Sequence, residues 1–235
     1  METNELKKFV AGLLETVTNM ANNKDAEYDR IIFIGAHGTG KSTLAKELSN
    51  IIGIPVVESV AREFFKNWKY LIDTGTIKEI AYTDKQLADI KQNILCSMSR
   101  WDYMRWVEAS TPVIMTRCPL DTLAYALADD LVSLDVANTN LKILKEHNEF
   151  CESLKNSLFI YLPIEFSLEN DGVRPMGNEY QKKVDEAMRD LLYKFGITPL
   201  VVTGSVDERV KQVMVKIAGE EMANLYIDTY KKLQK

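Results

Sequence analysis

The stretch "IIFIGAHGTGKSTLAKELS" (residues 31–49) joins three different kinds of sequence in a short span. Residues 31–34 are four apolar residues in a row, which is typical of a fully buried strand. Residues 35–40 contain three glycines, and residues 41–52 carry leucine and isoleucine at the spacing of one helix face. The stretch therefore predicts a strand, a glycine-rich loop and a helix, in that order.

The loop has the spacing of a phosphate-binding motif. Gly35, four further residues and then Gly40, Lys41 and Ser42 match the pattern G-x-x-x-x-G-K-[ST]. Together with Gly38, these glycines can take positive φ and let backbone N–H groups close around an anion. The helix N-terminus that follows adds a partial positive charge. A plain turn before a helix would also use glycine, but the strand and helix on either side favour a phosphate loop.

In this interpretation the loop binds the phosphates of ATP. Lys41 is expected to reach the β and γ phosphates, Ser42 to give its hydroxyl to Mg²⁺, and Thr43 to lie beside the α phosphate. His37 occupies a variable position of the motif and is expected to face solvent. The residues predicted to bind the nucleotide are Gly35, His37, Gly38, Thr39, Gly40, Lys41, Ser42 and Thr43.

Length and composition favour one globular domain. A chain of 235 residues with 46% hydrophobic residues can bury a sizeable core. The formal net charge of −5 and the absence of a basic run argue against extended nucleic-acid binding. Cys96, Cys118 and Cys151 are odd in number and lack C-x-x-C spacing, which is typical of reduced thiols. With no membrane-length apolar run and no signal sequence, we expect a cytoplasmic protein without a membrane partner.

Short apolar runs alternate with longer helical patterns along the rest of the chain. The predicted strands span residues 54–59, 111–116, 158–163 and 199–204. The predicted helices span residues 60–73, 84–109, 119–133, 138–155 and 178–195. This alternation predicts an α/β fold, a three-layer sandwich with a parallel five-stranded sheet between helices.

An amphipathic stripe over residues 4–20 predicts a further helix before the first strand. A polar segment separates this helix from the strand. We therefore divide the chain into an N-terminal helix, residues 1–24, and a phosphate-loop domain, residues 25–235.

Parallel sheets bind ligands beyond the carboxyl ends of their strands, so the residue after each strand is a candidate for chemistry. Glu58 ends the second strand. It could accept a proton from an attacking hydroxyl or hold Mg²⁺ through water. The alternative is a glutamate in a first helical turn, where it would only interact with the helix dipole.

Arginines also stand near two of these strand ends. Arg62 follows Glu58 by one helical turn, and Arg117 follows the third strand directly. Either could neutralise phosphate oxygens or serve as a structural ion-pair partner, and the position of Arg117 favours the catalytic role. Asp121 is a candidate cap for the helix beginning near Thr122.

The segment between the fourth strand and the next helix, residues 163–183, has the composition of a loop. Asp171 and Gly172 favour a turn, Pro175 discourages a continuous helix, and Arg174 stands between them. A lid that closes over the transferred phosphate would use such an arginine. A plain surface loop remains the alternative.

Four segments together resemble a known family of enzymes. They are "GAHGTGKST" (35–43), "VVESVARE" (56–63), "TRCPLDTLAYAL" (116–127) and "ENDGVRPMGNEYQKKVDEAMRDLL" (169–192). Over roughly residues 30–215 the chain is similar to the P-loop kinases that include ribosylnicotinamide kinase domains and phage nucleoside or deoxynucleoside monophosphate kinase-like proteins, with an AAA-type P-loop ATPase domain. The resemblance implies ATP-dependent phosphoryl transfer to a nucleoside-type acceptor, with Glu58 near the acceptor and Arg174 in the lid.

The chain departs from this family at the end of the third strand. Such kinases often have an acidic residue before the arginine, and here Thr116 precedes Arg117. The acidic partner of Mg²⁺ would then be Glu58, Asp121 or water alone.

Other classes of P-loop protein fit less well. A GTPase would need an N-K-x-D segment after the loop, and the string "NNKD" (22–25) precedes it. An ATPase motor would need acids closing the third strand, where "VIMTR" (113–117) has none. We expect a small nucleoside or nucleotide acceptor, with DNA as an open but disfavoured substrate and a homodimer left open.

Overall fold

The computed structural model describes residues 28–77, 82–109, 111–165 and 178–233. In these residues one sheet contains β1 (Arg30–Ile34), β2 (Val56–Val57), β3 (Val113–Met115), β4 (Ser157–Tyr161) and β5 (Leu200–Val201). Its strand order is β2-β3-β1-β4-β5, and every neighbouring pair is parallel. This confirms the predicted parallel five-stranded sheet.

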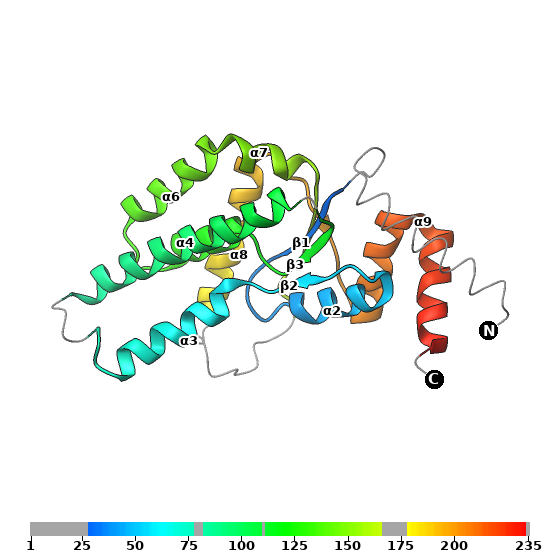
Figure 1. Cartoon of the computed structure of the whole chain (residues 1–235), viewed down its shortest axis with the longest axis horizontal. Helices are drawn as coiled ribbons and strands as arrows, with labels where there is room; N and C mark the ends of the chain where they lie inside the picture. Colours follow the sequence, from blue (N-terminus) through cyan, green and yellow to red (C-terminus); the bar gives the residue numbers. More distant parts are fainter. Residues whose placement is uncertain (1–27, 78–81, 110, 166–177, 234–235) are drawn as a thin grey trace.

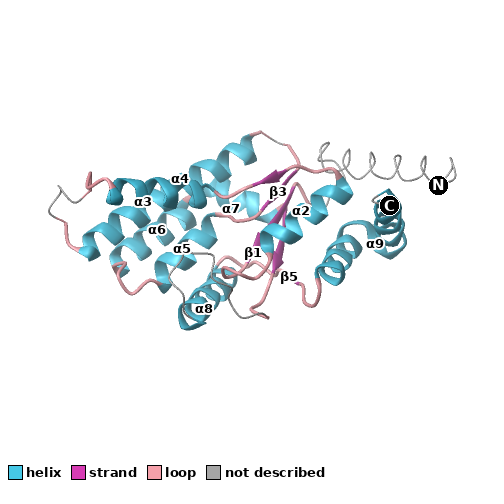
Figure 2. Cartoon of the chain, turned by 90° about the horizontal axis from the view of Figure 1, so that it is seen from below, coloured by secondary structure: helices cyan, strands magenta, loops and turns pink. Residues whose placement is uncertain are grey.

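Helices cover both faces of the sheet (Figures 1 and 2). They are α2 (Lys41–Ile52), α3 (Val60–Asp73), α4 (Asp84–Glu108), α5 (Pro119–Ala128), α6 (Leu134–Glu146), α7 (Asn148–Lys155), α8 (Asn178–Lys194) and α9 (Val206–Leu233). Successive strand residues point to opposite faces. Ile32 and Ile34 therefore join the core under α4, α5 and α8, whereas Ile31 and Phe33 join the core under α2 and α9. The three-layer prediction is confirmed.

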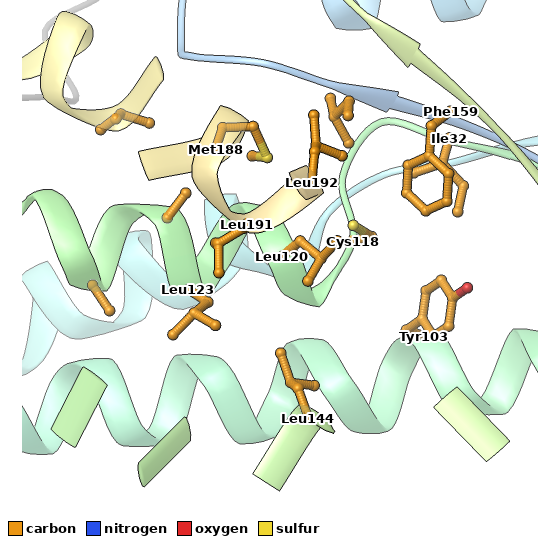
Figure 3. Close-up of a cluster of buried hydrophobic side chains, with 14 of the residues drawn as sticks. Ile32, Tyr103, Cys118, Leu120, Leu123, Leu144, Phe159, Met188, Leu191 and Leu192 are labelled. Carbon is orange, nitrogen blue, oxygen red and sulfur yellow. The ribbon is translucent and has the colours of Figure 1, made fainter. Parts of the chain in front are cut away.

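Part of the first core is drawn in Figure 3. Ile32 and Phe159 come from the sheet, and Met188 and Leu192 come from α8. Burying β1 completely between two helical layers accounts for its uninterrupted apolar sequence, since both faces of the strand are covered. This fixes the position of the loop that leaves β1 at Gly35.

Helix boundaries differ from prediction at two places. The helix predicted over 119–133 ends at Ala128, and Ser133 begins α6 by accepting a hydrogen bond from the Val136 amide (3.4 Å). The helix predicted over 138–155 is two helices, because His147 leaves helical geometry (φ −84°, ψ 93°). The His147 Nδ1 atom then accepts a hydrogen bond from the Phe150 amide (3.1 Å), which starts α7.

The C-terminal helix α9 was not predicted. It is bent at Gly219, whose φ of 78° and ψ of 166° interrupt the helical backbone. The predicted N-terminal helix, residues 1–24, and residues 166–177 of the predicted lid lie outside the described residues. None of the helices in the described part is both long and apolar enough to span a membrane.

Candidate active site

The loop after β1 has the backbone geometry that the motif predicted. Gly35, Gly38 and Gly40 have φ values of 135°, 76° and 91°. A Cβ atom on Gly35 would lie 2.5 Å from the carbonyl oxygen of Leu162, so even an alanine would collide with the backbone there. Gly40 is the N-cap residue of α2 and makes no side-chain cap, which leaves the first N–H groups of the helix facing a ligand position.

Lys41 lies inside this loop and is 6% exposed. Its Nζ atom donates to the carbonyl oxygen of Gly35 (2.7 Å), to that of Ala36, and to the Thr39 hydroxyl (3.3 Å). The Thr39 hydroxyl in turn donates to the Ala36 carbonyl (2.9 Å). The ammonium group is thus held inside the loop by carbonyl and hydroxyl oxygens of the loop itself.

A cavity of about 190 Å³ opens beside the loop. The loop residues His37 to Thr43 form one side of it, with Glu58 and Arg62 from the end of β2 and start of α3, and Arg117 from the end of β3. The structure therefore brings Glu58 and Arg117 to the phosphate loop. Arg174, the fourth predicted catalytic residue, lies outside the described residues.

Glu58 is not part of a helix. Ser59 is the N-cap of α3 and accepts a hydrogen bond from the Ala61 amide (3.1 Å), so Glu58 precedes the helix and Glu63 occupies its first turn. The Glu58 carboxylate is 55% exposed and lies 3.7 Å from Lys46 Nζ. The alternative interpretation of Glu58 as a first-turn glutamate is wrong.

Arg117 both lines the cavity and packs against α5. Its Nη1 atom lies 3.5 Å from Asp121 Oδ1, and its Nη2 atom donates to the Tyr125 hydroxyl (3.4 Å). Asp121 Oδ2 accepts a hydrogen bond from the Cys118 amide (2.9 Å), so Asp121 takes part in the cap as the third residue of α5. The N-cap residue is Cys118 and the helix begins at Pro119, so the prediction that Asp121 itself precedes a helix beginning near Thr122 was wrong. Burial raises the pKa of the Asp121 carboxyl, against the opposing charges of Arg117 and Lys41.

His37 is buried, and the prediction that it faces solvent was wrong. The side chain is 4% exposed. Its Nδ1 atom lies 3.3 Å from the Tyr125 hydroxyl, and its ring centroid lies 6.0 Å from those of Tyr125 on α5 and Tyr180 on α8. Two helices distant in the sequence cover this position, which the motif alone could not indicate.

A family profile described as an AAA domain matches residues 30–209, from the start of β1 to the first turns of α9. The chain belongs to the AAA domain family. Its phosphate loop makes it a P-loop nucleotide-binding protein. A search of curated proteins finds no match.

Solved structures of a nucleoside kinase share the fold of this AAA domain. Deoxyadenosine kinase from M. mycoides with bound dATP superposes with a TM-score of 0.56 at 18% identity, over 80% of this chain and 98% of that one. The same enzyme with bound dCTP superposes with a TM-score of 0.52 at 16% identity, over 80% of this chain and 98% of that one. With the products dCMP and dCDP bound, the TM-score is 0.50 at 13% identity, over 86% of this chain and 99% of that one. At these identities the likeness is one of fold.

Two residues of the AAA domain that contact the loop were missed from the sequence. Gln181 on α8 donates to the His37 carbonyl, and Arg209 on α9 donates to the Thr39 carbonyl and pairs with Glu165. The sequence carries a signal for both, because each is a polar residue at a position on the apolar face of its helix. Such a residue needs a buried partner.

The described part of the AAA domain contains no group of three or more His, Cys, Asp and Glu side chains that would hold a metal alone. Mg²⁺ in nucleotide sites keeps several waters and takes one or two protein ligands besides the phosphates. Ser42 and Glu58 line the same cavity and fit that sparse donor set. The assignment of Ser42 as a magnesium ligand stays a prediction.

Proposed function

We propose that this AAA domain is an ATP-dependent kinase that transfers the γ-phosphoryl group to a nucleoside hydroxyl or to a (deoxy)nucleoside monophosphate. The observation that carries the proposal is the cavity of about 190 Å³, which Glu58 and Arg117 line together with the phosphate loop. A carboxylate and a guanidinium beside bound phosphates are the groups that phosphoryl transfer to a hydroxyl needs.

The loop is proposed to bind the donor. Backbone N–H groups of the loop and of the first turn of α2 would hold the phosphates, with Lys41 neutralising negative charge at the transferred group. Bound Mg²⁺ would supply further charge neutralisation, held by the Ser42 hydroxyl and the phosphates. Arg117, which lines the same cavity, would contact oxygens of the donor or acceptor.

Glu58 is proposed to act on the acceptor. Its carboxylate is half exposed in the cavity, and its pairing with Lys46 at 3.7 Å is a solvent-exposed one, which holds a side chain only weakly. It is therefore available to take the proton of an attacking hydroxyl, or to orient that hydroxyl.

The choice of acceptor rests on two arguments. The solved kinase that shares the fold binds deoxynucleotides, which supports a nucleoside-type acceptor. A net charge of −5 disfavours DNA, the alternative acceptor, either at a hydroxyl end or at a modified base.

The test is ATP consumption and product formation with separate acceptors. The panel contains nucleosides, (deoxy)nucleoside monophosphates, ribosylnicotinamide and hydroxyl-bearing DNA. Transfer to one of the small acceptors supports the proposal. Transfer to DNA alone supports the alternative, and ATP hydrolysis that no acceptor stimulates would indicate a non-kinase ATPase.

Glu58→Gln is predicted to slow transfer by about 10²-fold or more, because general-base assistance typically contributes 10²–10⁴-fold. ATP affinity should stay nearly unchanged. The matched control is Glu63→Gln, which removes the acidic residue in the first turn of α3 and should leave the rate as it is. If raised Mg²⁺ restores part of the lost rate, Glu58 also serves the metal, whereas parental turnover in Glu58→Gln rules out its catalytic role.

A further inference from the structure

Two carbonyl groups of the phosphate loop accept hydrogen bonds from side chains far away in the sequence. Gln181 Nε2, on α8, donates to the carbonyl of His37 at 2.7 Å. Arg209 Nη1, on α9, donates to the carbonyl of Thr39 at 2.8 Å. Gln181 is 2% exposed and Arg209 is 3% exposed, so both bonds are shielded from water.

Each of these bonds also sets the direction of an N–H group. A trans peptide unit is planar, and its C=O and N–H bonds point in opposite directions. Holding the His37 carbonyl therefore orients the N–H of Gly38, and holding the Thr39 carbonyl orients the N–H of Gly40. Lys41 and the Thr39 hydroxyl orient the preceding units in the same way.

Each of the two peptide units held by Gln181 and Arg209 leads into a glycine of the loop, Gly38 or Gly40. Gly38 and Gly40 lack a Cβ atom and can adopt many conformations when nothing holds them. A loop that must be ordered on binding loses affinity, and a loop already ordered does not.

We propose that Gln181 and Arg209 are positioning residues that pre-organise the phosphate loop, so that α8 and α9 set the affinity for nucleotide. The inference rests on the ATP binding that the proposed function requires, and it is independent of the acceptor. Neither side chain lines the cavity beside the loop, so each acts through the backbone it holds.

Arg209 also makes a second interaction, so substituting it tests the role of the loop contact less directly. It pairs with Glu165, and Glu165 accepts a hydrogen bond from the Gly204 amide (3.1 Å). Removing its charge would leave Glu165 without this pair and destabilise the region. Gln181 has no such charge, so its substitution reports more cleanly on the loop.

The experiment compares Gln181→Met with Gln92→Met. Gln92, on α4, is a matched control: it is 3% exposed, and its Nε2 atom donates to the backbone carbonyl of Thr122 at 2.8 Å. Both variants lose one buried hydrogen bond between elements. The dissociation constant of ATP is measured by calorimetry without acceptor, below the melting temperature of each variant.

Gln181→Met should raise the Kd of ATP about 3- to 10-fold, the range expected for one net hydrogen bond. Gln92→Met should leave it within about twofold, even at an equal loss of melting temperature. With an acceptor present, the KM for ATP should rise in Gln181→Met while kcat changes little. An unchanged Kd in Gln181→Met, or an equal rise in both variants, overturns the inference.

Arg209→Lys is the second variant and decides the matter if Gln181→Met does not fold. Lysine keeps the charge beside Glu165 but lacks the guanidinium fork that reaches Glu165 and Thr39 together. Its Kd for ATP should also rise, and a parental Kd overturns the inference. A wild-type protein that binds ATP but phosphorylates no acceptor contradicts the kinase proposal alone, because this readout needs no acceptor.

Discussion

Lys41 is a buried cation whose ammonium group is surrounded by oxygens of its own loop. A buried charge is costly unless hydrogen bonds replace the water that it loses. The carbonyls of Gly35 and Ala36 and the hydroxyl of Thr39 supply such bonds. A lysine ammonium has three donors on a flexible stem, so it can exchange one loop oxygen for a phosphate oxygen without leaving the loop.

Lys41→Met is predicted to lower transfer by about 10²–10³-fold, the usual loss for one pre-organised donor to developing negative charge. The fold should persist with a lower melting temperature, because two loop carbonyls lose their hydrogen-bond donor. Each buried acceptor left without a donor costs about 1–3 kcal/mol of stability. Transfer rate and melting temperature are measured together. Lys142→Met, an exposed substitution on α6, is the control, and full transfer in a folded Lys41→Met contradicts the phosphate-loop interpretation.

The packing of α4 against α5 buries polar groups as well as apolar ones. Gln92 on α4 donates to the Thr122 carbonyl on α5 and to the sulfur of Cys96 (3.5 Å). Cys96 is 7% exposed. Burial raises the pKa of the Cys96 thiol to about 11, because a thiolate there would be poorly solvated. Burial at this position therefore favours the protonated thiol.

The raised pKa of Cys96 predicts that the stability of the folded protein falls at alkaline pH. The unfolded thiol ionises near its ordinary pKa of 9.0, whereas the folded one keeps its proton to about 11. Between these values the folded state binds more protons, so stability falls as pH rises. A difference of two pKa units between the folded and unfolded states corresponds to about 2–3 kcal/mol of unfolding free energy. Urea denaturation measures the unfolding free energy of the parent and of Cys96→Ala between pH 8 and 11. The unfolding free energy of the parent should fall over this range relative to that of Cys96→Ala, and an equal pH dependence in the two proteins would contradict the prediction.

The chain gathers its candidate chemistry at one edge of the sheet. The carboxyl ends of β1, β2 and β3 are neighbours in the strand order, and the loop, Glu58 and Arg117 follow them. The helices α8 and α9 then reach this edge from opposite faces of the sheet. The cavity is therefore assembled from segments spread over most of the domain, and its ligand should stabilise all of them together.

ATP is predicted to raise the melting temperature of the protein. A ligand at 100 times its Kd stabilises the folded state by about 2.7 kcal/mol. For a chain of this size the shift is about 5–10 °C. Thermal scans with and without ATP and Mg²⁺ measure it, and Lys41→Met serves as the control with a reduced shift. The absence of a shift at millimolar ATP would contradict nucleotide binding at the loop.

The candidate site was partly predictable from the sequence, because several of its residues belong to one short motif or directly follow a predicted strand. The spacing of Gly35, Gly40 and Lys41 predicted the positive φ values and the loop, and the apolar alternation predicted the parallel sheet. The strand-end rule predicted that Glu58 and Arg117 would meet the loop, and the cavity contains both. The roles of these residues stay predictions, as does the part that Arg174 has in a lid.

Local sequence determined the strand, the loop and the helix start, since these depend on backbone preferences and on spacings of a few residues. Packing determined which side chains hold that loop. Gln181 lies 144 residues from His37, and Arg209 lies 170 residues from Thr39. His37 is buried for the same reason, because α5 and α8 cover it. Contacts of this kind arise only when helices pack on the two faces of the sheet, and no local spacing encodes which polar residue on an apolar face will meet which carbonyl.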